Sequence, residues 1–309
     1  MKAISLNGYT FYFECASKFH SFLIIKGLVH SQSGAAVSIA SVELKGDGIQ
    51  FQKSAIRAEE NGNNFAYKFE LEAISLSNGY HADMGVEIAI DGVKLFISIR
   101  DITAVLQHLD KDLGQQFLQH VNEAGKIKLL DIGGRARSGV LRADDFSTVE
   151  TTVIDIVSDT GVDIVVDAHN MSSKLNKDEF DACMCISVFE HLIMPWKVVL
   201  EVNKVMKTGG VFLVATHQTV GLHDMPWDYY RFSDSAWDGL FNKFTGFEIV
   251  GRAMSGLNYI TPFAWSADKN FAERACGYES STVLVRKTGD SKLQWPVIAS
   301  DLVDDNYPE

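Results

Sequence analysis

The stretch LLDIGGRARSG, from Leu129 to Gly139, joins an apolar run to a carboxylate and then to a glycine-rich turn. This order is typical of a buried strand that ends at the ligand-binding edge of a parallel sheet. The glycines do not form the G-x-G-x-x-G pattern of a dinucleotide site, and the Gly-Lys-Ser/Thr of a phosphate loop is absent. Asp131 would also repel a phosphate at this point. The stretch therefore favours a nucleoside that lacks phosphate and carries a positive group.

Strands and helices alternate outward from this stretch, which predicts a parallel sheet with crossover helices. A helix is expected from Pro195, with Gly209-Gly210 as its stop. A second helix is expected in SDSAWDGLFNKF, residues 233–244, with Phe244 among the aromatic residues of its buried face. The expected strands are KIKLLDI, TTVIDI, VDIVVDA, FDACMCISV and GGVFLVAT, followed by FEIVGRAM and STVLVRK as a closing antiparallel pair.

The first hundred residues have a different pattern, with strand-like segments rich in β-branched and aromatic residues separated by Asn, Gly, Ser and Asp. Asp91-Gly92 between two alternating runs predicts a tight hairpin. We expect an all-β sandwich over 1–100 and a connecting helix over 101–125. The α/β domain should then span 126–290, with an acidic tail at 291–309.

Composition excludes several classes of partner. The 309 residues have a net charge of −12, which argues against nucleic acid or an anionic membrane, and no apolar run is long enough to span a bilayer. The start lacks a signal-peptide pattern, and the four cysteines are best explained as reduced thiols, so a cytoplasmic location is expected. A homo-oligomer remains open.

Two further acids follow strands along the chain. Asp155 ends the strand after the opening stretch, where an acid can bind ribose hydroxyls, and Asp167 ends the next, where it can accept a bond from an adenine amine. Each alone would pass for a strand-end or capping residue. Three acids at successive strand tips favour a nucleoside site.

Residues from about 125 to 290 resemble a class I S-adenosylmethionine-dependent methyltransferase. The resemblance rests on LLDIGG, on Asp155, on the DAH of residues 167–169, and on FDACMCISVFEHLIMPWKVVLEVNKVMKTGGVFLVAT, which contains the family's EHL and a variant of its LKPGG. It implies a seven-stranded Rossmann-like sheet with an antiparallel final hairpin. It also implies S-adenosylmethionine as cofactor, bound by Asp131, Gly133, Gly134, Asp155, Ile156, Asp167, Ala168 and Ser187.

The opening stretch departs from the family at Arg135 and Arg137, where a further glycine is usual. Either the arginine side chains leave the pocket, or one pairs with the carboxylate of the cofactor's methionine part.

The loop HQTVGLHDMPWDYYRFS, residues 217–233, follows the fifth strand of this sheet and should stand over the transferred methyl group. A hydroxyl acceptor must lose a proton, and histidine suits this near neutral pH. We assign His223 with Asp228, His217 and His191 as candidate catalytic residues. Trp227, Tyr229 and Tyr230 could stack on a sugar and Arg231 could bind an acidic group, although the aromatics could equally close the core. Related methyltransferases with a similar loop are associated with glycans or secondary products.

The leading hypothesis is an S-adenosylmethionine-dependent methyltransferase that acts on a hydroxyl of a sugar, glycan or related metabolite, with no metal ligand assigned. One alternative is a protein that kept the fold as a binding or scaffold module without turnover. Another is an N- or C-methyltransferase of a small metabolite.

Overall fold

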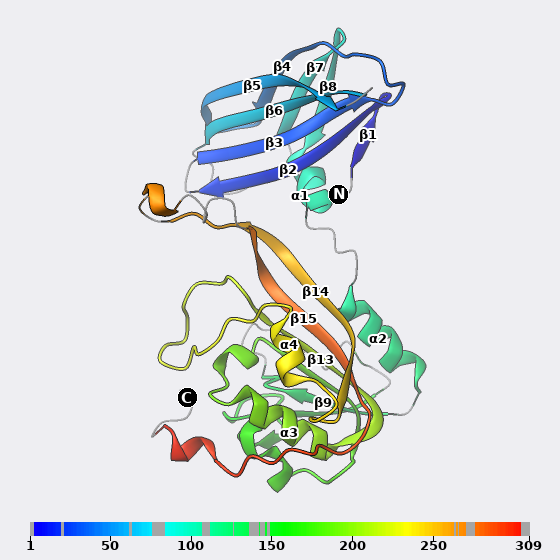
Figure 1. Cartoon of the computed structure of the whole chain (residues 1–309), viewed down its shortest axis with the longest axis vertical. Helices are drawn as coiled ribbons and strands as arrows, with labels where there is room; N and C mark the ends of the chain where they lie inside the picture. Colours follow the sequence, from blue (N-terminus) through cyan, green and yellow to red (C-terminus); the bar gives the residue numbers. More distant parts are fainter. Residues whose placement is uncertain are drawn as a thin grey trace. The chain divides into compact units, whose positions relative to one another are not determined.

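The computed structural model describes residues 3–19, 22–61, 64–75, 84–106, 112–125, 127–135, 142, 146, 149–262, 264, 266–269 and 276–303. The chain forms two compact units, residues 1–108 and 109–309 (Figure 1). Each has its own hydrophobic core.

The first unit consists of two antiparallel sheets. One has the strand order β1-β2-β3-β6-β5, and the other has the order β4-β7-β8. Their bounds are β1 Ile4–Leu6, β2 Tyr9–Phe19, β3 Phe22–Ser31, β4 Ile39–Lys45, β5 Ile49–Asn61, β6 Asn64–Ser75, β7 Gly85–Ile90 and β8 Val93–Ser98. Alternate residues of both sheets, such as Phe11, Ile25 and Val86, bury their side chains in one shared core. The predicted all-β sandwich is therefore confirmed.

The predicted hairpin at Asp91-Gly92 is also present, between β7 and β8. Both residues have positive φ angles, 47° and 80°. This backbone matches the twist of the two flanking strands and favours glycine at the second position.

The second unit is built on a seven-stranded sheet of order β11-β10-β9-β12-β13-β15-β14. Its strands are β9 Lys128–Ile132, β10 Glu150–Asp155, β11 Ile164–Val165, β12 Phe180–Ile186, β13 Met206–His217, β14 Phe247–Tyr259 and β15 Cys276–Lys287. The first five pair in parallel, while β15 pairs antiparallel with both β13 and β14. This is the predicted Rossmann-like sheet, with the strand order reversing beside β9.

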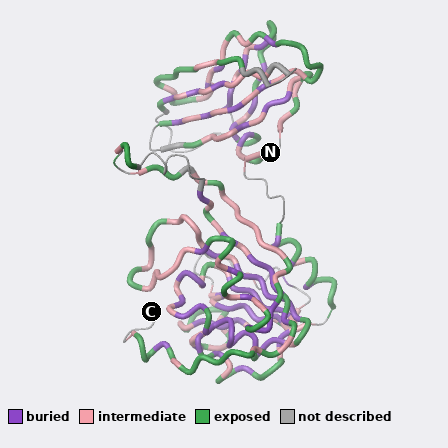
Figure 2. The backbone as a smooth tube through the Cα atoms, in the orientation of Figure 1, coloured by how far each residue is buried: buried purple, intermediate pink, exposed green. Residues whose placement is uncertain are grey.

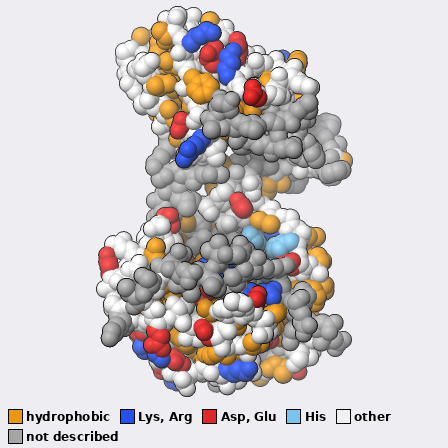
Figure 3. Space-filling model, turned by 180° about the vertical axis from the view of Figure 1, so that it is seen from behind, with side chains coloured by type: hydrophobic (Ala, Val, Ile, Leu, Met, Phe, Trp, Pro, Cys, Tyr) orange, Lys and Arg blue, Asp and Glu red, His pale blue; other side chains and the backbone are white. Residues whose placement is uncertain are grey.

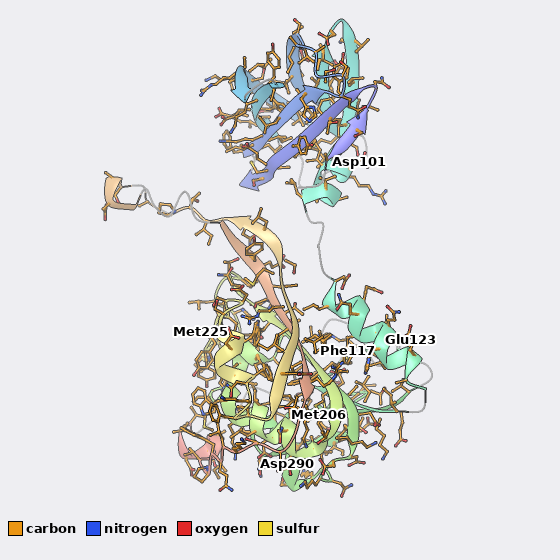
Figure 4. The ribbon with its side chains drawn as sticks, turned by 45° about the vertical axis from the view of Figure 1, so that its right-hand side comes forward. Asp101, Phe117, Glu123, Met206, Met225 and Asp290 are labelled. Atoms are coloured by element: carbon orange, nitrogen blue, oxygen red, sulfur yellow. The ribbon has the colours of Figure 1, made fainter. Side chains whose placement is uncertain are left out.

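Side chains alternate along each strand of this sheet, so every strand contributes residues to both faces. Different helices cover the two faces. Leu130, Cys183 and Phe212 point to the face packed by α3 (Pro195–Val205) and α4 (Ala236–Leu240). Their neighbours point to the opposite face, where α2 (Leu113–Glu123) packs. Phe117 on α2 lies toward the sheet and Glu123 toward solvent (Figure 4). Figure 2 shows the buried strands between these layers.

The expected single helix over 101–125 is wrong. The structure has α1 (Ile99–Leu106) in the first unit and α2 in the second. Asp112 has extended backbone angles, and its carboxylate accepts a hydrogen bond from the backbone N–H of Gln115 at 3.0 Å. An acid in this conformation begins a helix, so the helical periodicity on its two sides belongs to separate elements.

The expected helix over 233–244 is shorter than predicted. The Asn242 side chain bonds the backbone N–H of Phe244 at 3.0 Å and the carbonyl of Asp238 at 3.1 Å. Asparagine offers the chain such local alternatives to helical bonding. Phe244, expected on the buried stripe, is half exposed.

The segment 291–303, expected as the beginning of an acidic tail, packs on α3. Lys197 donates to the carbonyl of Trp295 at 2.8 Å, and the Trp295 indole lies edge-on to Trp196 at 5.7 Å between ring centroids. A short 3₁₀ turn at Ala299–Asp301 follows, in which Ala299 is buried. Residues 304–309 lie outside the described part of the chain.

Candidate functional site

A cavity of about 440 Å³ opens in the second unit at the carboxyl ends of β9, β10 and β12. Its walls include six of the eight residues predicted to bind the cofactor: Gly133, Asp155, Ile156, Asp167, Ala168 and Ser187. They also include five residues predicted to act on or bind the acceptor: His191, His217, His223, Trp227 and Tyr229. One cavity thus brings together the strand-tip acids and the histidines.

Five predicted residues do not line this cavity: Asp131, Gly134, Asp228, Tyr230 and Arg231. Each has contacts that explain its position. The Tyr230 hydroxyl donates to the carbonyl of Ile193 at 3.1 Å, and its ring packs against the core.

Asp131 is completely buried, and neither carboxylate oxygen has a hydrogen-bond partner among the residues that the structure describes. It pairs with Val153 on β10, so it lies deeper in the sheet than Asp155, which ends that strand. The three acids are therefore not level with one another. Burial raises the pKa of Asp131 to about 6, with an opposing influence from Arg142 and a smaller supporting one from Asp155.

The glycines of the opening stretch are required by close approach. A Cβ on Gly134 would lie 2.4 Å from Oδ2 of Asp131. Gly133 has a φ of +73°, and a Cβ there would lie 2.3 Å from the Val188 side chain. The turn therefore needs bare backbone at both positions.

Asp155 and Asp167 present carboxylates to the cavity. Oδ1 of Asp155 accepts a hydrogen bond from the backbone N–H of Val157 at 3.0 Å. Oδ1 of Asp167 accepts from both the backbone N–H and the ring Nδ1 of His169, at 2.9 and 2.7 Å. Burial alone would raise the pKa of Asp167, but the bonds from His169 outweigh it and lower the pKa. Asp167 is therefore ionised near neutral pH.

Of the two unassigned arginines, Arg135 lines the cavity, with Nε 3.9 Å from Oδ2 of Asp155. Its side chain thus stays in the pocket. Arg137 lies outside the described residues.

Arg231 and Asp228 hold the loop after β13 together. The guanidinium forms a two-bond pair with the Asp228 carboxylate at 2.6 and 2.7 Å and also donates to the carbonyls of Val220, Gly221 and Tyr230. The hydrogen bond from Arg231 lowers the pKa of Asp228 to about 2. The Asp228 carboxylate accepts a hydrogen bond from the backbone N–H of His223 at 2.9 Å. Nδ1 of the His223 ring lies farther away, at 3.6 Å from Oδ2 of Asp228.

Three histidines meet around a buried glutamate, Glu190, in the 3₁₀ turn Phe189–His191. The rings of His191 and His223 have centroids 5.0 Å apart, and those of His217 and His223 are 5.3 Å apart. Nε2 of His217 lies 3.0 Å from Oε1 of Glu190. Burial lowers the pKa of His217, against an upward pull from Glu190, so this ring is neutral at pH 7. Histidine side chains gather at one place on the second unit (Figure 3).

Sequence reasoning assigned no role to Glu190, although it is 0% exposed and also bonds the hydroxyl of Thr216. Its backbone carbonyl accepts from the N–H groups of Tyr229 and Tyr230, which ties the loop to this turn. Glu190 follows the end of the buried strand β12 by four residues, and this position alone did not indicate a role. Ala299 and Val303 of the C-terminal segment also line the cavity and carried no signal.

The sheet order, the glycine turn and the acid-lined cavity at the carboxyl ends of the strands define a nucleoside-binding α/β unit. Residues 145–214 match the family model described as "Methyltransferase domain". The second unit thus carries a methyltransferase domain of the S-adenosylmethionine-dependent class. The residues present fit that cofactor, since the buried Asp131 carboxylate has no hydrogen-bond partner in the described ranges and Asp155 and Asp167 face a cavity bounded by bare backbone at Gly133.

Solved structures with similar folds include a SAM-dependent methyltransferase of Archaeoglobus fulgidus, with 15% identity over 56% of this chain and 90% of that one, at a TM-score of 0.43. The 1,6-didemethyltoxoflavin-N1-methyltransferase of Burkholderia thailandensis has 14% identity over 61% and 82%, at 0.41. A complex of the Haloferax volcanii Trm112 methyltransferase activator with a methyltransferase gives 13% over 55% and 88%, at 0.39. At these scores the domain assignment rests on the family match and the sheet order.

A search of curated proteins gives no match. Within the described residues, helices long and apolar enough to cross a bilayer are absent.

Proposed function

We propose that this protein transfers a methyl group from S-adenosylmethionine to a hydroxyl oxygen of a sugar, glycan or related metabolite. The observation that carries the proposal is that one cavity has nucleoside-binding acids on one wall and three histidines on another. A cavity of this kind can hold cofactor and acceptor side by side, and such placement is the main contribution an enzyme makes to a direct displacement.

The cofactor side is formed by the strand tips. Asp155 accepts the ribose hydroxyls, Asp167 faces the adenine, and Asp131 provides negative charge beneath the turn. Arg135, whose side chain stays in the pocket, binds the carboxylate of the methionine part. When bound, S-adenosylmethionine supplies the electrophilic methyl group.

The acceptor side is formed by His191, His217 and His223, with Trp227 and Tyr229. His217 is neutral at pH 7 because its pKa is lowered, so it can take up a hydroxyl proton. The two aromatic side chains give the flat apolar surface on which a sugar ring stacks, which supports a carbohydrate acceptor.

Reduced Cys15, Cys183 and Cys185 support a cytoplasmic location.

The test is incubation of the protein with methyl-labelled cofactor and panels of sugars and matched amines, with products identified by mass spectrometry. We expect label on oxygen, and we expect His217→Ala to lower kcat by about 10²–10⁴-fold. Transfer to amines that is unaffected by His217→Ala would favour N-methylation. Cofactor binding without transfer to either panel would favour the scaffold alternative.

A further inference from the structure

The cluster formed by Glu190, His191 and His223 has the composition of a metal site. One donor atom from each residue lies within 4.8 Å of the other two. Ligands on a tetrahedral ion with bonds of about 2.1 Å are about 3.4 Å apart, so small side-chain rotations bring the three donors to one ion.

Two hydrogen bonds set the orientation of the imidazoles. Nδ1 of His191 lies 2.8 Å from the carbonyl oxygen of Trp227, and Nδ1 of His223 lies 3.0 Å from that of Gly221. A carbonyl can only accept, so each Nδ1 donates to it, and Nε2 is the ring nitrogen that remains to bind an ion. Histidines that bind metals are held this way, with one nitrogen bonded to backbone and the other turned to the ion.

The surroundings of these nitrogens call for a cation. Nε2 of His191 lies 4.0 Å from Oε1 of Glu190 and 3.9 Å from Oδ2 of Asp224. Two carboxylates this close to the ring nitrogen would both attract a positive ion placed beside it.

Glu190 provides an independent observation. Its side chain is 0% exposed, and Oε1 accepts no hydrogen bond within the described part of the chain, although Nε2 of His217 lies 3.0 Å away. A buried carboxylate oxygen without a hydrogen bond is unfavourable, and metal coordination supplies the missing partner.

We propose that Glu190, His191 and His223 bind a first-row divalent metal ion whose open positions face the cavity and take the acceptor oxygen. Two imidazoles and one carboxylate suit Zn²⁺ and its neighbours rather than Mg²⁺ or Ca²⁺. The three ligands come from two segments more than thirty residues apart in sequence, so their spacing is not that of a local metal motif.

The role of this ion rests on the proposed function. Coordination lowers the pKa of the acceptor hydroxyl, whose proton passes to His217. The bond between the acceptor oxygen and the methyl carbon then forms as the bond from that carbon to sulfur breaks. The electron pair of the broken bond remains on sulfur. Binding of the ion itself does not depend on this step.

The test uses the full chain, free of any affinity tag and stripped of metal with chelator, titrated with Zn²⁺ by calorimetry and with Co²⁺ by visible absorption. We expect one ion per chain, with the intense d–d bands of a low-coordinate Co²⁺ site. His191→Ala and His223→Ala should each weaken binding more than about 100-fold, because losing a ligand exceeds the ~10–100-fold cost of losing an outer partner. The matched control is His120→Ala, an exposed histidine on α2, which should bind as wild type does.

Melting curves of the metal-free variants identify any that fail to fold, and Glu190→Gln gives a third removal of a ligand. Absence of saturable binding in the wild type, or wild-type affinity in folded His191→Ala and His223→Ala, would overturn the site. Full-rate methylation of a hydroxyl by the metal-free protein would overturn the role of the ion and leave the proposed function standing. Stoichiometric metal binding without methylation of hydroxyls would overturn the proposed function and leave the metal site standing.

Discussion

Gly134 lies against the Asp131 carboxylate, with no room for a side chain. Gly134→Ala places a methyl group 2.4 Å from that carboxylate and 2.8 Å from Val153, so the turn must shift. We expect a loss of about 1–3 kcal/mol in the free energy of unfolding and at least tenfold weaker binding of S-adenosylhomocysteine, measured by denaturant titration and calorimetry. The control is Gly239→Ala, where the new methyl meets nothing within 4 Å and should be neutral or slightly stabilising. Unchanged stability and affinity in Gly134→Ala would contradict the tight turn.

Asp131 should make the stability of the ligand-free protein depend on pH. Its pKa is raised by burial from 3.8 to about 6, so the folded state binds this proton more tightly than the unfolded state does. The stability from this group is fully present below pH 3.8 and is lost as pH rises through about 6, a change of about 3 kcal/mol. Subtracting the pH profile of Asp131→Asn from that of the wild type should isolate this loss. Parallel profiles would show that the carboxylate titrates normally.

The strand-tip acids were predictable from sequence because parallel strands end at one edge of a sheet, and Asp155 and Asp167 line the cavity there. The role of Glu190 was not predictable from sequence, because it depends on His217 and His223, which only the fold brings close to it. His223 with Asp228, predicted as a pair, are neighbours, but Arg231 binds that carboxylate more closely.

At the scale of elements, the segment 291–303 forms part of the cavity wall through Ala299 and Val303. Trp295 anchors it, with its indole N–H 3.2 Å from the sulfur of Met194 and its ring against Trp196. We expect Trp295→Ala to weaken S-adenosylhomocysteine binding about tenfold, or about 1.4 kcal/mol, in a calorimetric titration. Leu293→Ala, half exposed in the same segment, serves as the control. Equal affinities in the two variants would show that the segment does not shape the cavity.

Element types were more predictable than element ends. Apolar alternation identifies strands of the first unit, and short continuous apolar runs identify the central strands of the second unit, which are buried on both faces. The boundaries of α2 and α4 depend instead on single side chains, Asp112 and Asn242, that bond the backbone locally. The C-terminal segment was misjudged because its acidic composition suggests solvent, while its contacts come from Trp295 and Ala299.

For the whole molecule, the cavity residues all belong to the second unit. We expect the chain 109–309, which has its own core, to bind S-adenosylhomocysteine with wild-type affinity. We propose that the first unit binds the acceptor at a point outside this cavity, so removal of the first unit should raise the acceptor KM with little change in cofactor affinity. Equal loss of both, in a truncated chain that still melts cooperatively, would contradict this division.

The most direct measurement is a crystal structure of the protein with S-adenosylhomocysteine. We expect the adenosine in the cavity, with its ribose hydroxyls on Asp155, its adenine beside Asp167 and its sulfur facing His191, His217 and His223. A ligand bound elsewhere, or a cavity left empty at saturating ligand, would contradict the assignment of this site.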